Sequence, residues 1–140
     1  MHTYATALAL ADVTIPDHLT ADAEVPILTG PQAQGDLLVL PTKVPANVTW
    51  ETVPAAGVQA VASEATGHTH WLHQGFDSTG VRWARIGRGG DIVIGYVTVP
   101  VGETALLVHT DEHGANGIGA GTYAILGKRE LAEMERRVAD

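Results

Sequence analysis

From Asp36 onward the apolar runs of the chain are short and rich in β-branched residues, and a Gly or Pro interrupts them every eight to twelve residues. This spacing is typical of a small all-β domain, because strands of about five residues each end at a turn. It predicts a mainly β fold, a small antiparallel β-sandwich or barrel. The expected strands are Asp36–Leu40, Val58–Ser63, His68–His73, Val81–Ile86, Ile92–Val99, Thr104–His109 and Thr122–Leu126.

The segments between these strands are expected to be turns and loops. Asp77–Gly80 and Arg88–Asp91 predict hairpin turns, because glycine readily adopts the positive φ that such turns need. The glycine-rich stretch Gly114–Gly121 has neither the spacing nor the Lys-Ser/Thr ending of a phosphate-binding loop. It is therefore predicted to be a flexible loop.

The last segment of the chain predicts one α-helix, over Lys128–Val138. Leu131, Met134 and Val138 recur at helical spacing and form a narrow apolar stripe. This stripe is expected to pack against the sheet or against a partner subunit.

Residues 1–34 differ in composition from the rest of the chain. They contain no Lys or Arg, and Pro16, Pro26 and Pro31 interrupt a weak apolar pattern. The sequence therefore predicts an extended acidic N-terminal arm at 1–34 and a single β domain at 35–140. Because such an arm needs something to hold it, a homo-oligomer or an assembly partner bound through the arm is expected.

Charge and composition exclude several classes of function. A formal net charge of −8 disfavours phosphate backbones and anionic lipid, so neither nucleic acid nor a membrane is expected as a partner. The chain has no run of about 18 apolar residues and no basic segment in its mildly apolar start. A cytoplasmic protein, or a virion protein if phage-encoded, is expected. The absence of cysteine excludes disulfides and thiolate ligands.

Histidines gather in two short windows of the sequence. Five of the seven lie there, namely His68, His70 and His73 in the first window and His109 and His113 in the second. Neutral imidazole is the commonest protein ligand of transition metals, and two such segments can converge on one ion. We therefore predict one divalent transition metal ion, zinc before iron or manganese, with the ligands His68, His70, His109 and His113.

Strand alternation ranks the candidates in the first window. Residues two apart on a strand face the same side and lie about 6.6–6.8 Å apart, so His68 and His70 can reach one ion while His73 points away. Glu64 lies four residues before His68 and is a candidate ligand or base, or simply a charged residue at a strand end. A pair of surface histidines that binds nothing is the alternative for this window.

The second window formally matches H-x-x-E-H, a zinc signature of some metallopeptidases. That signature works on a helix, whereas here an apolar strand precedes His109 and a glycine-rich stretch follows His113, so a peptidase is not expected. Asp111 or Glu112 is instead a candidate oxygen ligand, or a hydrogen-bond partner of a ligand. A solvated loop is the alternative here.

Residues 64–70, 109–113, 121–123 and 129–130 together resemble a family of small bacterial and phage proteins with a G-H-x-H … H-x-E-H … G-x-Y … R-E pattern. The resemblance covers about residues 36–131 and implies one metal-centred β domain without implying a reaction. The layout is also similar, more distantly, to the cupins, in which H-x-H and a later His bind a metal inside a β-barrel. Residues 71–76 lack the glutamate that usually follows H-x-H in cupins.

These patterns favour a small metal-binding β domain with a structural or binding role. Four protein ligands would close a zinc site, whereas three ligands and a water would leave an open catalytic position. One alternative is a phage virion protein, for example a capsid-decorating or assembly protein whose arm wraps a neighbour. Another is a small cupin-like metal-dependent enzyme in which His73 or Glu64 acts as acid or base.

Overall fold

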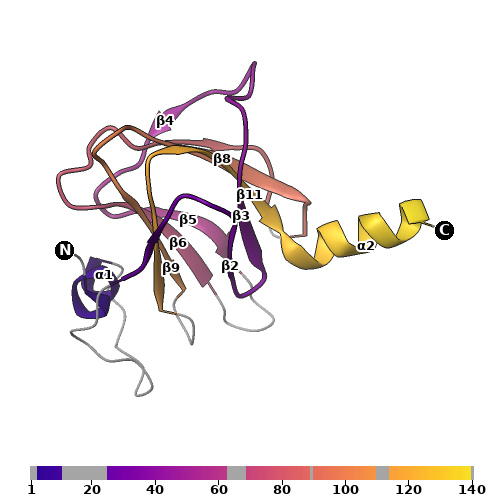
Figure 1. Ribbon diagram of the computed structural model, residues 1–140, viewed down its shortest axis with the longest axis horizontal. Coiled ribbons are helices and arrows are strands. Elements are labelled where there is room, and N and C mark those ends of the chain that lie inside the picture. The colour runs from indigo at the N-terminus through magenta and orange to yellow at the C-terminus, as the bar shows by residue number, and fades with distance from the viewer. Residues whose placement is uncertain (1–2, 11–24, 63–68, 89, 110–113, 140) are drawn as a thin grey trace.

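The computed structural model describes residues 3–10, 25–62, 69–88, 90–109 and 114–139, which fold into two packed β-sheets and two helices (Figure 1). The helices are α1 (Tyr4–Leu10) and α2 (Lys128–Ala139). The strands are β1 (Ile27–Leu28), β2 (Gln32–Gln34), β3 (Leu37–Pro41), β4 (Glu51–Thr52), β5 (Val58–Ala62), β6 (Thr69–Gln74), β7 (Arg82–Arg85), β8 (Val93–Val99), β9 (Ala105–His109), β10 (Ala115–Ile118) and β11 (Gly121–Gly127).

Each sheet is built mainly from antiparallel neighbours. The first sheet has the strand order β1-β10-β9-β6-β5, and the second has the order β2-β3-β11-β8-β7-β4. Among the described strands, β1 and β10 form the one parallel pair. The predicted mainly β sandwich with a C-terminal helix is therefore confirmed, and the described strands form two sheets instead of a closed barrel.

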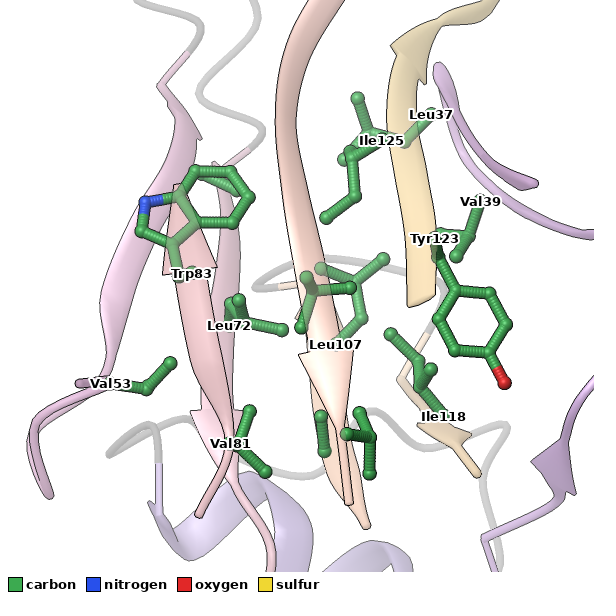
Figure 2. Close-up of a cluster of buried hydrophobic side chains, with 14 of the residues drawn as sticks. Leu37, Val39, Val53, Leu72, Val81, Trp83, Leu107, Ile118, Tyr123 and Ile125 are labelled. Atoms are coloured by element: carbon green, nitrogen blue, oxygen red, sulfur yellow. The ribbon is translucent and has the colours of Figure 1, made fainter. Parts of the chain in front are cut away.

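The core lies between the two sheets and follows from strand alternation. Leu72 of β6 and Leu107 of β9 point from the first sheet toward Tyr123 and Ile125 of β11 in the second (Figure 2). All four side chains are buried, and each aliphatic one contributes about 1.5–3 kcal/mol relative to an exposed side chain. This core holds β6 and β9 side by side in a register that places their inward-facing residues directly opposite one another.

The outer face of the first sheet is also apolar and is covered by the N-terminal segment. Leu106 and Val108 alternate with Leu107, so they point outward, where Ala7 of α1 and Val25 pack on them. A strand that is apolar on both faces needs cover on both. The helix α1 differs from the extended arm that the sequence predicts, because this apolar outer face gives the segment a surface on which to fold.

The end of the same segment joins the second sheet. Gln32–Gln34 forms β2, which pairs antiparallel with β3 at the sheet edge. Its glutamines alternate with exposed Ala33, so both amide side chains are buried between the sheets. This placement brings a polar side chain from the predicted arm to the histidines described below.

One predicted hairpin turn is confirmed and one is wrong. The turn at Arg88–Asp91 connects β7 to β8 within the second sheet, and the Asp91 N–H donates to the Arg88 carbonyl at 3.0 Å. Asp77–Gly80 instead leads from β6 in the first sheet to β7 in the second. It is held there because the Gly80 N–H donates to the Glu103 carboxylate at 2.6 Å.

The glycine-rich stretch after His113 is a strand, not the flexible loop predicted. Ala115–Ile118 forms β10, which pairs with β9 on one side and with β1 on the other. A Cβ at Gly117 would lie 2.8 Å from Cγ1 of Ile27, so glycine lets β1 approach closely. The glycines here serve close packing between strands as well as turning.

The C-terminal helix α2 follows β11 directly and points away from the sheets (Figure 1). Leu131 at its base is half-buried, whereas Met134 is 41% and Val138 81% exposed. The predicted apolar stripe thus packs on the sandwich at one end only. Among the described helices, none combines the length and the apolar character needed to cross a membrane.

Candidate metal centre

His70 and His109 meet at one end of the sandwich. They are paired residues of the antiparallel strands β6 and β9, two positions beyond the paired core residues Leu72 and Leu107. Because residues two apart share a face of a strand, both imidazoles point inward, as the two leucines do. The ring centroids are 4.4 Å apart with an angle of 38° between the planes, and the side chains are only 3% and 1% exposed.

Gln34 fixes the protonation pattern of the His70 ring. The Gln34 amide nitrogen donates to the Leu107 carbonyl at 2.8 Å, with the Gly114 carbonyl at 3.5 Å, so its oxygen must face His70. That oxygen lies 3.0 Å from Nδ1 of His70 and can only accept, so Nδ1 carries the hydrogen. In a neutral ring Nε2 is then the nitrogen with a lone pair, as a metal ligand requires.

The backbone of His109 is linked to the same hydrogen-bonded group through Gly114. The His109 N–H donates to the Gly114 carbonyl at 2.8 Å, which is the second carbonyl near the Gln34 amide. Gly114 has a φ of 66°, a conformation that favours glycine. Gln34, His70, His109 and Gly114 thus form one connected group that joins β2 of the second sheet to β6 and β9 of the first.

The structure brings together two of the four predicted ligands. His68 and His113 lie outside the described residues, as do Glu64, Asp111 and Glu112. Within the described part of the chain, no group of three or more His, Cys, Asp or Glu side chains is placed to hold a metal ion. Of the predicted ligands, the structure therefore describes His70 and His109 only.

His73 lies on the opposite face of β6, where strand alternation places it. It pairs with the outward residue Leu106 and is 1% exposed. The segment before β5 covers the ring so closely that a Cβ on Gly57 would lie 2.5 Å from its Cε1. The structure thus separates His73 from the His70 and His109 pair by the thickness of the sheet.

Neither nitrogen of the buried His73 ring makes a hydrogen bond of normal geometry to the described residues, although the Ala55 backbone lies near enough to act on the ring. Burial lowers the pKa of His73 below its ordinary value of 6.5, and an opposing interaction with the Ala55 backbone only partly offsets this. The ring is therefore held neutral and packs as an apolar group would.

Comparison with known proteins identifies a family. A family model described as "Domain of unknown function (DUF8820)" matches residues 33–128, most of the chain. The chain belongs to this family. No curated protein and no solved structure matched the chain.

The DUF8820 domain contains the described part of the candidate site. Its span begins at Ala33 and includes Gln34, His70 and His109, whereas α1 and nearly all of α2 lie outside it. A family without an assigned function agrees with the resemblance to a family without a known reaction. The specific histidine pattern and the more distant cupin resemblance stay predictions.

The sequence analysis does not single out Gln34, the residue of the DUF8820 domain whose side chain lies against His70. Composition places it in the predicted arm, which ends at residue 34, and glutamine is not among the usual metal ligands. One signal was available: Gln32 and Gln34 alternate with Ala33 directly before an apolar run, which is a strand pattern with its polar residues on one face. Only the sheet packing shows that this face points inward.

The two described imidazoles of the DUF8820 domain are donors of the kind that divalent transition metals bind. The described part of the site consists of two imidazoles, and the Gln34 amide lies where a hydrogen-bond partner would lie behind a metal-bound histidine. Such donors suit zinc, iron and other transition metals, in contrast to Mg²⁺ and Ca²⁺, which prefer oxygen. Two imidazoles supply half of a four-ligand zinc site.

Proposed function

We propose that the DUF8820 domain of this protein binds one divalent transition metal ion, zinc in the first place and iron or manganese next, at the end of the sandwich marked by His70 and His109. The observation that carries the proposal is the inward pair of imidazoles in register on β6 and β9, with the Gln34 amide accepting a hydrogen bond from Nδ1 of His70.

Chain connectivity supports His68 and His113 as the other two ligands. β6 begins at Thr69 and β9 ends at His109, and in an antiparallel pair the start of one strand lies beside the end of the other. The start of β6 and the end of β9 therefore lie at the same end of the first sheet, and one histidine window adjoins each of them. His68 precedes β6 by one residue, and His113 precedes Gly114, whose carbonyl already bonds to His109.

A structural role follows from four such ligands. Four nitrogen ligands close a tetrahedral zinc site and leave no position for a substrate. The metal would tie β6 to β9 at the end of the sheet where the hydrophobic core stops. It would bind the folded chain and not the unfolded one, so its binding free energy would add to the stability of the domain.

Metal analysis of protein purified without an affinity tag tests the proposal. We expect about one equivalent of metal per chain, as one four-ligand site requires. His70→Ala and His109→Ala should each lose most of it. The matched control is His73→Leu, which removes an equally buried histidine from the other face of β6 and should keep the metal.

Two results would contradict the proposal. One is a metal content well below half an equivalent after reconstitution. The other is retention of full occupancy by both His70→Ala and His109→Ala. Replacement of His68 and His113 by alanine then tests the ligands outside the described residues, where unchanged occupancy would remove either residue from the site.

The cupin-like enzyme is separated from the structural site by the coordination of the metal. In the cobalt-substituted protein, a closed four-histidine site should give the same visible spectrum with and without azide, because no ligand position is open. A shift on adding azide would favour the enzyme. Ser78 gives no support to a nucleophile, because its hydroxyl donates to the Phe76 carbonyl and accepts from the Thr104 N–H.

A further inference from the structure

The C-terminal helix α2 has an apolar face that the sandwich does not cover. The helix extends beyond the matched family domain and away from the sheets (Figure 1), and Met134 and Val138 on it are exposed. An isolated helix of this length is marginal in water, because short helices rarely repay the cost of nucleation. A partner on this face would supply the packing that the sandwich does not.

The apolar residues of α2 have the heptad spacing of a short coiled coil. Leu131 and Val138 are seven residues apart, and Met134 lies three residues after Leu131, as the two core positions of a heptad do. The residues that flank this seam are all charged. They are Lys128 and Glu135 on one side and Glu130 and Arg137 on the other.

We propose that α2 pairs antiparallel with α2 of a second copy of the chain, which makes a symmetric dimer. Placing Leu131 of one helix against Met134 of the other fixes the register, and the two-fold axis repeats this contact. In that register Glu130 meets Arg137 of the second copy, and Lys128 meets Glu135 of the second copy. Every flanking charge then faces an opposite charge.

The charges also select against the parallel arrangement. In a parallel coiled coil the flanking residue of one heptad meets the residue five positions later on the partner, so Glu130 would face Glu135 twice. Parallel helices further place their dipoles side by side in the same direction, whereas antiparallel helices oppose them. A two-fold axis closes the assembly at two copies, because the same face serves both.

The preferences of a lone helix do not account for this face. Glu130 in the first turn and Arg137 in the last would stabilise an isolated helix through its dipole. Lys128 in the first turn opposes that dipole, and a lone helix leaves Met134 and Val138 in water. Antiparallel pairing covers Met134 with Leu131 of the second copy and gives Lys128 the partner Glu135, whereas Val138 lies beyond this contact, opposite Gly127 of the second copy.

Light scattering after size exclusion, over a concentration series of the full chain, tests the proposal. We expect a reversible dimer that Met134→Glu abolishes. Arg137→Glu and Glu130→Arg alone should each raise the dissociation constant about tenfold, since each turns two attractive pairs into repulsive ones. The double variant that carries both changes should restore the dimer, because the charges are only exchanged.

Arg136→Glu is the matched control. It makes the same charge change one residue away, at a position that faces away from the seam, and should leave the dissociation constant unchanged. Circular dichroism of each variant checks that α2 remains helical. A monomer at all concentrations, a dimer insensitive to Met134→Glu, equal effects of Arg136→Glu and Arg137→Glu, or a double variant no better than the single ones would each overturn the proposal.

Discussion

The Gln34 side chain of one sheet accepts a hydrogen bond from Nδ1 of His70 in the other, at 3.0 Å. The same amide donates to the Leu107 carbonyl at 2.8 Å. One buried side chain therefore crosses between the two sheets and sets which nitrogen of His70 carries the hydrogen. Gln34 thus contributes to the packing of the two sheets and would also orient His70 toward the proposed metal.

Replacement of Gln34 separates these two contributions. Gln34→Leu keeps the size of the side chain but leaves the Leu107 carbonyl and Nδ1 of His70 without their partner, which should cost about 1–3 kcal/mol of unfolding free energy. Loss of the group behind a metal-bound histidine typically lowers metal affinity by about 10–100-fold. Chemical denaturation and a competitive metal titration measure the two effects.

Gln34→Glu is the informative second variant. Its carboxylate still accepts from Nδ1 of His70, but it cannot donate to the Leu107 carbonyl. We expect a loss of stability similar to that of Gln34→Leu, with metal affinity closer to that of the natural protein. Equal metal affinities for all three proteins would show that Gln34 serves the fold alone.

The burial of the His73 ring leads to a prediction about stability. His73→Leu replaces two buried nitrogens, which make no hydrogen bond of normal geometry to the described residues, with an apolar side chain of similar size. Replacing unsatisfied polar groups by apolar ones is neutral or stabilising, so we expect a gain of up to roughly 1 kcal/mol at pH 7. Thermal and urea unfolding measure it. A loss of more than about 1 kcal/mol would mean that the ring has a role in binding or packing that leucine lacks.

The same residue should make stability depend on pH. Because burial lowers the pKa of His73 in the folded protein, the unfolded chain binds a proton first as pH falls below the ordinary value of 6.5. The contribution of His73 is therefore fully present above pH 6.5 and is lost as pH falls through the lowered pKa. In the metal-free protein, His73→Leu should reduce the fall in unfolding free energy between pH 7 and pH 5. An unchanged profile would contradict the assignment.

The sequence predicted the sandwich well, because strand alternation and turn spacing are local properties. Leu72 lies on the same face of its strand as His70, as alternation requires, whereas β9 is apolar from Ala105 to Val108, so only the packing shows that Leu107 points inward. The β10 strand was missed since Gly117 is there to admit β1, a contact between distant segments. The helix α1 was missed for a similar reason: Ala7 folds onto Leu106 and Val108, and nothing local to α1 shows that surface.

The placement of the described histidines could also be predicted only in part. The two-residue periodicity of a strand separates His70 from His73, and this separation is what the structure shows. The pairing of His70 with His109 depends on the register of β6 against β9, which sequence spacing does not give. Gln34 reaches His70 only through the packing of one sheet on the other, so no pattern within its own segment could have named its partner.

Metal removal should act on the whole domain. The proposed metal would bind the folded chain alone, so its removal by chelation would cost about 2.7 kcal/mol if it is present at a hundred times its dissociation constant. The ligands must be neutral, so this contribution should fade as pH drops through the region of about 6.5, near the ordinary histidine pKa. Melting curves of the metal-loaded and chelated proteins should converge between pH 8 and pH 5. Curves that stay parallel would contradict a histidine-bound metal.

The packing of α1 can be tested with two alanines of the same helix. Ala7 is buried against Leu106 and Val108 on the outer face of the first sheet, whereas Ala9 is exposed. Ala7→Glu would bury a carboxylate with no partner or detach the helix, so we expect it to uncover β9 and β10. Ala9→Glu adds the same charge two residues away and should change little. Amide hydrogen exchange, read on residues 105–118, measures the difference.

The oligomeric states of Ala7→Glu and Met134→Glu add a second readout. If α1 covers its own sheet, Ala7→Glu exposes an apolar face and should promote aggregation without abolishing a dimer formed through α2. If the N-terminal segment instead joins neighbouring chains, as an assembly role requires, Ala7→Glu should dissociate the oligomer while Met134→Glu does not. The two substitutions therefore assign association to one end of the chain or the other, because each removes one surface and leaves the other in place.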